Sequence, residues 1–407
     1  MELFGKRSFI KKENEMGRIY IFTGKGGVGK SSVAAAHAIK SASEGKRTLL
    51  VSTDMAHNLG DIFNRKLGKE VENLLPNLDI YEINPDYVMQ NDFSDITKYL
   101  GDLLLEADTY GMHDMGMIPG MEELFSLLKI VEIYNGKKYE RIIVDCAPTG
   151  ETLALLKFPE LLSWYMEKLF PIGKVGVRML APISKSVFKV EMPNRNAMND
   201  IEKMYLKLVE LQELLKNRDV TSIRIVTVPE KMVVEETKRN YMYMNLYNFN
   251  VDGLYINRIL PKDINNDFFN QWLSIQGEYV SYLKESFAAL PIYEIPWYDE
   301  ELRGEENIRR IVEDVLSGNE IFANTIITER ESFKQVDTGY QLDVFLPGAD
   351  KSNIDLYQTT TDIVIKTGNF KRNISLPNIL RSFVVKGAKF DEGKLSIMFE
   401  RGSDYDE

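Results

Sequence analysis

Short runs of apolar residues recur along the first three quarters of the chain, separated by stretches with a mixed apolar and polar pattern. Five of these runs have the length of β-strands and are rich in Ile, Val, Leu and Tyr: 18–23, 47–53, 141–145, 222–228 and 253–257. Continuous apolar runs of this length are typical of strands that helices cover on both faces. Their alternation with helical stretches predicts an α/β fold with a doubly wound, mostly parallel sheet, in which ligands bind at the carboxyl ends of the strands.

The pattern changes after about Ile321. The remaining segment contains short strand-like runs, which are interrupted by Pro-Gly, Thr-Gly, Leu-Pro and Glu-Gly turn signals. In the last run the apolar residues alternate with polar ones, so that Leu395, Ile397 and Phe399 share one face. This pattern predicts a small antiparallel β-sandwich.

Composition and charge narrow the classes of protein. The 407 residues are 44% hydrophobic and 27% charged, which is typical of a folded protein with a sizeable core. The formal net charge of −11 argues against nucleic-acid binding, since an acidic surface repels phosphate backbones. No apolar run reaches the ~18 residues of a membrane helix, and residues 1–16 lack the apolar stretch of a signal peptide. We therefore expect a cytoplasmic protein without direct membrane insertion.

A phosphate-binding motif follows the first predicted strand. Its residues fit the pattern G-x-x-x-x-G-K-[ST]: Gly24, Lys25, Gly26, Gly27, Val28, Gly29, Lys30 and Ser31, followed by Ser32. The glycines let backbone N–H groups surround a phosphate, and the N-terminus of the following helix favours an anion. In such a motif Lys30 neutralises phosphate charge and Ser31 offers its hydroxyl to Mg²⁺. The motif predicts an ATP and Mg²⁺ site; the alternative is a glycine-rich turn that binds no nucleotide.

The second lysine of this loop, Lys25, makes a family resemblance specific. Four further stretches follow the loop in order: STDMAHNLGDIF, DCAPTGETLALL, TVPEKMVVEETKR and PWYDEELRGEENI. Together they resemble the family of arsenical-pump ATPases (ArsA) and tail-anchored-protein targeting ATPases over about residues 17–316. The resemblance implies a homodimeric ATP hydrolase in which Lys25 reaches the phosphates held by the partner subunit, as an arginine finger does. The alternative for Lys25 is a solvated loop lysine.

The resemblance also implies roles for carboxylates that follow two of the strands. Asp54 orients or activates the attacking water, although an aspartate there could also cap a helix. Asp61 belongs to the same switch segment. Asp145 holds Mg²⁺ through water, and a second switch follows it, formed by Pro148, Thr149 and Gly150.

The adenine site is implied at two other strand ends. Asn257 and the turn Pro229–Glu230 match family positions around the adenine ring, and an amide such as that of Asn257 offers both a donor and an acceptor. The alternative for Asn257 is a residue that only turns the chain at the end of a strand.

Some positions depart from the family pattern. Met55 replaces a proline, Cys146 a threonine and Glu151 a histidine. Cys146 is the only cysteine, and the chain has one phosphate loop, so arsenite handling through cysteine thiolates is disfavoured. For the same reason we expect neither a zinc site nor an iron–sulfur cluster.

Two functions beyond ATP hydrolysis remain open. Flexible apolar side chains suit a surface for hydrophobic helical protein segments, and they occur in two stretches: Met112, Met115, Met117, Met121, Trp164, Met166 and Met179. The alternative is that these residues form dimer contacts and core. The first function is accordingly a targeting-type chaperone, and the second is a regulatory switch ATPase that docks a soluble partner through its β-domain.

The expected organisation has five parts. A flexible leader, 1–16, precedes the ATPase domain with its helical insertions, 17–318. The start of translation could also be Met16. A linker, 319–335, leads to the β-sandwich, 336–402, which resembles the α-crystallin domain of small heat-shock proteins, and a tail, 403–407, follows.

Overall fold

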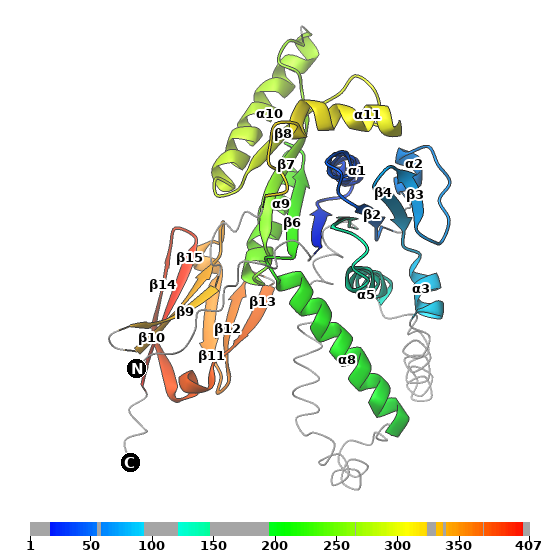
Figure 1. The fold of residues 1–407 in the computed structure, drawn as a ribbon. Coiled ribbons are helices and arrows are strands. Elements are labelled where there is room, and N and C mark those ends of the chain that lie inside the picture. Colours follow the sequence, from blue (N-terminus) through cyan, green and yellow to red (C-terminus); the bar gives the residue numbers. More distant parts are fainter. Residues whose placement is uncertain are drawn as a thin grey trace, which may run out of the picture. The chain divides into compact units, whose positions relative to one another are not determined.

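The structure is a computed structural model that describes the following residues: 17–54, 58–92, 121–146, 195–264, 266–323, 331–336, 339–368 and 370–401. The chain divides into two compact units. The first takes the chain up to Tyr20 and Ala34–Thr221, and the second takes Ile21–Val33 and the chain from Ser222 onward. Their helices and strands are labelled in Figure 1.

The largest sheet of the described residues has eight strands in the order β3-β4-β2-β5-β1-β6-β7-β8. Its strands are β1 (Arg18–Thr23), β2 (Thr48–Ser52), β3 (Glu72–Leu75), β4 (Leu78–Glu82), β5 (Arg141–Asp145), β6 (Thr221–Thr227), β7 (Val251–Ile259) and β8 (Ile292–Pro296). β2 is parallel to β4 and β5, and β7 is parallel to β6 and β8, whereas β3 is antiparallel to β4. The predicted α/β fold with a mostly parallel sheet is confirmed.

All five predicted strands are present, but the sequence pattern does not predict β3, β4 and β8. β3 and β8 lie at the two edges of the sheet, where most of their residues stay partly exposed and polar residues interrupt the apolar run. β4 carries Asp79 and Glu82 in a run of five residues. The apolar run that marks a central strand is therefore too short in all three.

Eight α-helices accompany the strands in the described part of the chain. They are α1 (Lys30–Ser43), α2 (Asn58–Ile62), α3 (Pro85–Asn91), α5 (Met121–Asn135), α8 (Arg195–Lys216), α9 (Lys231–Leu246), α10 (Asp267–Ser286) and α11 (Gly304–Ile311). Local sequence sets some of their starts: the Asn84 side chain accepts a hydrogen bond from Tyr87 N at the start of α3, and Asn266 does the same for Phe268 N at the start of α10. None of the described helices has the combined length and apolar character needed to cross a membrane.

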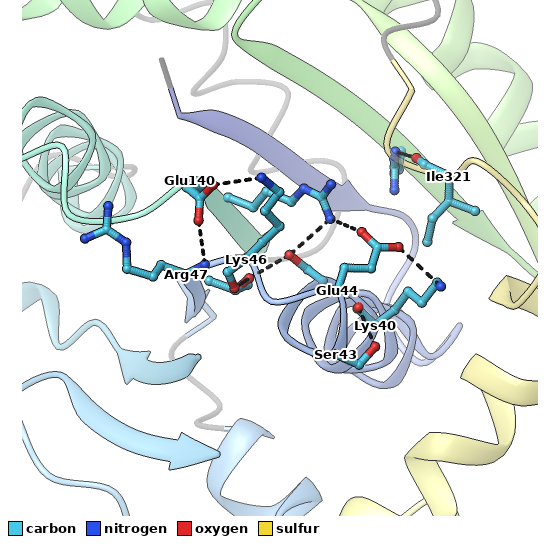
Figure 2. A network of polar contacts seen from close by, with 11 residues as sticks. Lys40, Ser43, Glu44, Lys46, Arg47, Glu140 and Ile321 are labelled. Atoms are coloured by element: carbon cyan, nitrogen blue, oxygen red, sulfur yellow. Dashed lines mark hydrogen bonds and ion pairs between the residues drawn. The ribbon is translucent and has the colours of Figure 1, made fainter. Parts of the chain in front are cut away.

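Polar contacts at the amino ends of β2 and β5 tie these strands to the end of α1 within the first unit. Glu140 accepts hydrogen bonds from the Lys46 ammonium at 2.9 Å and from the backbone N of Arg47 at 3.0 Å (Figure 2). The hydrogen bond from Lys46, followed by that from Arg47, lowers the pKa of Glu140. Arg141 then contacts Glu44, the residue directly after α1, at 2.6 Å. The carboxyl ends of the same strands, where Asp54 and Asp145 lie, are thus separate from this structural network.

The C-terminal segment forms two antiparallel sheets, as predicted. One has the order β14-β15-β10-β9 and the other β11-β12-β13. Their strands are β9 (Glu331–Val336), β10 (Gly339–Phe345), β11 (Ile354–Gln358), β12 (Asp362–Thr367), β13 (Phe370–Ser375), β14 (Phe383–Asp391) and β15 (Lys394–Arg401). Short 3-10 turns occur at Lys351–Asn353 and Asn378–Ser382, and a π-helical turn, Val312–Leu316, follows α11. The alternation predicted for the last strand is confirmed, since Leu395, Ile397 and Phe399 are all buried.

The strand β9 falls partly inside the stretch expected to be a linker. It pairs with β10 at the edge of the four-stranded sheet, where Phe333 lies opposite Leu342. Phe333 is the only aromatic residue in ESFKQV, and an edge strand needs few apolar residues because one side faces solvent. Because this stretch is mostly polar, its sequence pattern does not predict a strand.

The β-sandwich contacts the carboxyl end of α9 within the second unit. The rings of Tyr243 and Phe370 lie edge to face with centroids 4.5 Å apart. Arg372, which is 6% exposed, donates a hydrogen bond to the carbonyl of Leu246 and forms an ion pair with Glu331. A buried arginine at a helix C-terminus satisfies a backbone carbonyl and matches the helix dipole. The contact therefore joins β9 and β13 to α9.

Asp343 of β10 is a nearly buried carboxylate inside a polar network. It accepts hydrogen bonds from Gln341 at 2.5 Å, Ser396 at 2.7 Å and Lys334 at 3.2 Å. Burial alone would raise the pKa of Asp343, but these hydrogen bonds and the charge of Lys394 outweigh burial and hold the pKa below its ordinary value. The ionised form therefore stabilises the sandwich.

We expect this network to make the sandwich sensitive to acid. Because its folded-state pKa is lowered, Asp343 contributes stability above about pH 4 and loses that contribution as the pH falls through the folded-state pKa. Urea unfolding of Asp343→Asn and of the native chain should therefore differ most at neutral pH and converge in acid. Asp355→Asn, at an exposed position of β11, is the control. A difference that stays constant with pH would contradict this assignment.

Candidate functional site

The candidate phosphate site is the loop that joins β1 to α1. This loop and the first residues of α1, up to Val33, belong to the second unit. Two of its glycines have no room for a side chain: a Cβ on Gly24 would lie 2.1 Å from the carbonyl oxygen of Val226, and one on Gly29 would lie 2.3 Å from Nδ2 of Asn257. Gly29 also has a φ of 91°, which favours glycine. The loop is therefore pressed against the carboxyl ends of β6 and β7. Such a tight backbone cradle fits a polyphosphate.

The two lysines of the loop have different surroundings. Lys30 begins α1 and is 6% exposed, and its ammonium donates to the carbonyl of Lys25 at 3.5 Å. The Lys25 side chain is 37% exposed, and its ammonium lies 3.3 Å from a carboxylate oxygen of Glu236 on α9. Ser31 and Ser32 follow in the first turn of α1, where backbone N–H groups lack partners within the helix. The residues present therefore suit a nucleotide with Mg²⁺.

Asn257 supports the loop in this structure. Its Nδ2 donates to the carbonyl of Val28 at 2.8 Å, and its Oδ1 accepts from the backbone N of Arg258 at 2.9 Å. Asn257 is buried, whereas Glu230 at the start of α9 is exposed and Pro229 before it is buried. The adenine contact implied for Asn257, Pro229 and Glu230 stays a prediction. It is compatible with the two bonds of Asn257, because its amide nitrogen and its amide oxygen can each make a second hydrogen bond.

In the first unit, two candidate carboxylates lie at neighbouring strand ends. Ser52 of β2 and Asp145 of β5 are register partners, and the backbone N of Thr53 donates to the carbonyl of Asp145 at 3.0 Å. The backbone N of Asp54 then donates to the Ser52 hydroxyl at 3.1 Å. Asp145 is 1% exposed and Asp54 is partly exposed. The carboxyl edge of the parallel strands thus presents both, at the place where such sheets bind ligands.

Several predicted site residues are exposed or lie outside the described ranges. Asp61 is exposed on the short helix α2. The second-switch residues fall outside the described residues: Pro148, Thr149 and Gly150. So do most residues of the expected client surface: Met112, Met115, Met117, Trp164, Met166 and Met179. Met121 begins α5, but its side chain is not among those described.

Sequence reasoning missed Glu236. It lies in the stretch TVPEKMVVEETKR, where the adjacent Glu235 is exposed and contributes to a charged helix surface. The sequence gives no signal that separates Glu236 from Glu235; in the structure, its helix follows directly after the strand end that Gly24 contacts. Among the described residues, no cluster of three or more His, Cys, Asp or Glu side chains has the geometry of a metal site.

Comparison with known proteins identifies the family of the chain. Residues 17–317 match the ArsA ATPase family, described as anion-transporting ATPases, and residues 337–399 match the HSP20-like domain found in ArsA. A protein of Chlorobaculum tepidum that is named as an arsenical pump-driving ATPase is 34% identical over 390 residues, covering 94% of this chain and 96% of its own length. A similarly named protein of Aquifex aeolicus is 32% identical over 399 residues, covering 93% of this chain and 99% of its own length.

Other relatives match a smaller share of this chain. A protein of Pyrenophora tritici-repentis named ATPase get3 is 30% identical over 308 residues, covering 72% of this chain and 90% of its own length. The two family matches confirm the resemblance predicted from Lys25 and the four motif stretches, and they confirm the α-crystallin-like character of the sandwich. The chain belongs to the ArsA family of ATPases, is an ATP hydrolase, and carries the HSP20-like domain found in members of that family.

Proposed function

We propose that this ATPase works as a Mg²⁺-dependent homodimer, and that it binds a hydrophobic protein segment and releases it when ATP is hydrolysed. The observation that carries the dimeric part of the proposal is the different placement of the two loop lysines. Lys30 is buried and its ammonium contacts the phosphate loop itself, whereas the Lys25 ammonium contacts Glu236 of α9. The Lys25 ammonium therefore lies on α9 and not within its own phosphate loop, which supports action in trans.

The remaining catalytic roles follow from the positions of oxygen ligands. Mg²⁺ prefers oxygen, and we assign it to the Ser31 hydroxyl and, through water, to the Asp145 carboxylate. Bound Mg²⁺ would neutralise charge that develops on the phosphates. Asp54 follows β2 beside Asp145 and is partly exposed, as a group that positions water must be.

A role in arsenite handling is less consistent with this chain, although two of the relatives are named for an arsenical pump. Cys146 is the chain's only cysteine, and it is 2% exposed directly after β5. A buried thiol behaves as a small apolar side chain, and its low accessibility disfavours metal chemistry. Binding of a hydrophobic protein client requires no thiolate, so it agrees better with a chain that has one cysteine.

A second candidate is a regulatory switch that docks a soluble partner through the β-sandwich. The observation that favours it is the contact of the sandwich with α9, made by the Tyr243 and Phe370 rings and by Arg372 at the Leu246 carbonyl. The same helix carries Glu236, the partner of Lys25. A protein bound to the sandwich could therefore influence the phosphate loop through one helix.

Trapping the ATP state distinguishes these candidates. Asp54→Asn removes the carboxylate assigned to the water and should slow hydrolysis about 10²-fold or more while ATP still binds. Purification of this variant from cells with ATP, followed by identification of bound proteins, should then yield a set of proteins with a single hydrophobic span. Asp86→Asn, at the first turn of α3, is the control. One stoichiometric soluble protein would favour the regulatory switch, and full turnover of Asp54→Asn would refute the assignment of Asp54.

A further inference from the structure

Glu236 contacts the one loop residue that the proposed mechanism sends to the partner subunit. Its carboxylate lies 3.3 Å from the Lys25 ammonium, and the two side chains are 28% and 37% exposed. The ammonium of Lys30, by contrast, stays within the loop on the carbonyl of Lys25. Within this subunit, Lys25 is therefore paired with α9.

The position of Glu236 is fixed by its neighbours. The next residue, Thr237, is buried, and its hydroxyl lies 2.9 Å from the hydroxyl of Thr227 at the end of β6. The residue before Thr227, Val226, supplies the carbonyl against which Gly24 packs without room for a Cβ. One strand end thus anchors both the start of the phosphate loop and the turn of α9 that carries Glu236.

A carboxylate at this place competes with phosphates for the Lys25 ammonium. Ion pairs between partly exposed side chains contribute little to stability, because water screens them. The phosphates of a bound nucleotide carry several negative charges, so they attract an ammonium more strongly than one carboxylate does. The pair therefore places Lys25 on its own subunit at low energetic strength, and it can open when a nucleotide-loaded partner arrives.

We propose that Glu236 is a positioning residue that holds the Lys25 ammonium on its own subunit until the phosphates of a nucleotide-loaded partner displace it. The inference rests on the proposed action of Lys25 in trans. In energetic terms, Glu236 stabilises the state in which Lys25 rests on its own subunit relative to the closed dimer, the ATP-bound dimer in which Lys25 reaches the partner. Removing its charge should shift the population toward the closed dimer at a given ATP concentration.

The test is Glu236→Gln in the full chain, assayed for ATP turnover and for ATP-dependent dimerisation by analytical ultracentrifugation. We expect the ATP concentration for half-maximal turnover and for half-maximal dimerisation to fall about two- to fivefold, the range set by a partly exposed ion pair, with no fall in kcat. Glu235→Gln makes the same charge change on the adjacent, exposed position and should alter neither quantity. A fall in kcat, or no change in either half-maximal concentration, would overturn the proposal.

The same Glu236→Gln change, made in a Lys25→Ala chain, distinguishes a failure of this inference from a failure of the proposed function. In Lys25→Ala the ammonium is absent, so adding Glu236→Gln should have no further effect on dimerisation. If Lys25→Ala hydrolyses ATP at the native rate, action in trans is wrong. If Lys25→Ala is impaired but Glu236→Gln keeps its effect in that background, only the role of Glu236 is wrong. Thermal unfolding of Glu236→Gln and Glu235→Gln without ATP should give equal midpoints, which checks that neither change disturbs the fold.

Discussion

Replacement of Lys25 by alanine is expected to slow ATP hydrolysis by about 10³-fold or more, by analogy with an arginine finger supplied in trans. The variant keeps Lys30, Ser31 and the glycines of the loop, so it should still bind nucleotide. The loss should therefore appear in kcat measured by phosphate release at saturating ATP. Equal rates for the variant and the native chain would refute the in-trans account.

A mixture of two inactive variants tests which subunit uses the lysine. In a heterodimer of Lys25→Ala with Asp54→Asn, the first subunit keeps its own Asp54 and receives Lys25 from its partner. One site is then complete, so the mixture should hydrolyse ATP faster than either variant alone. A lysine that acted on its own subunit would leave both sites defective, and mixing would restore nothing. Lys231→Ala, at the exposed start of α9, is the control for the loss of one positive charge.

The central strands could be predicted because their sequence pattern is local. The run RIIVD becomes β5 without any change of bounds, and RIYIFT becomes β1 in the same way. Both are buried apart from their first residue, so hydrophobicity alone identifies them. The phosphate loop is equally local, since its glycines and lysines are consecutive and its contacts with Val226 and Asn257 require those glycines.

Elements stabilised by distant partners could not be predicted as well. The strand β7 begins at Val251, two residues before the predicted run, and includes Asp252. A charged residue normally ends an apolar run, but Asp252 is buried in β7 because Arg224 of β6 pairs with it. Local patterning cannot supply that information, because the partner lies in another strand.

The same limit applies to the candidate site. Roles for Asp54 and Asp145 are implied by the family resemblance, and the structure brings the ends of their two strands together. Glu236 could not be proposed, because nothing in its own stretch distinguishes it from Glu235. Only the packing of α9 beside the loop gives it a role. Asn257 shows the intermediate case, since its residue type suited a binding role and its observed contact is with the loop itself.

The pair of Arg224 and Asp252 should have the largest effect on stability. Their side chains are 3% and 2% exposed, and Nε of Arg224 lies 3.3 Å from Oδ1 of Asp252. Arg224 also donates to the carbonyl of Ile321. In Asp252→Ala the buried guanidinium loses this carboxylate, which should cost about 3–5 kcal/mol of unfolding free energy. Urea unfolding followed by circular dichroism measures this loss.

Two further variants show whether the loss of unfolding free energy in Asp252→Ala comes from the buried charge or from the loss of a side chain. Lys284 and Glu294 form an exposed pair, with side chains 51% and 41% exposed, so Glu294→Ala should change the unfolding free energy by less than about 1 kcal/mol. Removing both buried charges, in Arg224→Met with Asp252→Leu, should recover much of the stability lost in Asp252→Ala, because no uncompensated charge then remains in the core. If the double variant were no more stable than Asp252→Ala, the penalty would come from packing around Asp252 instead of from the charge left on Arg224.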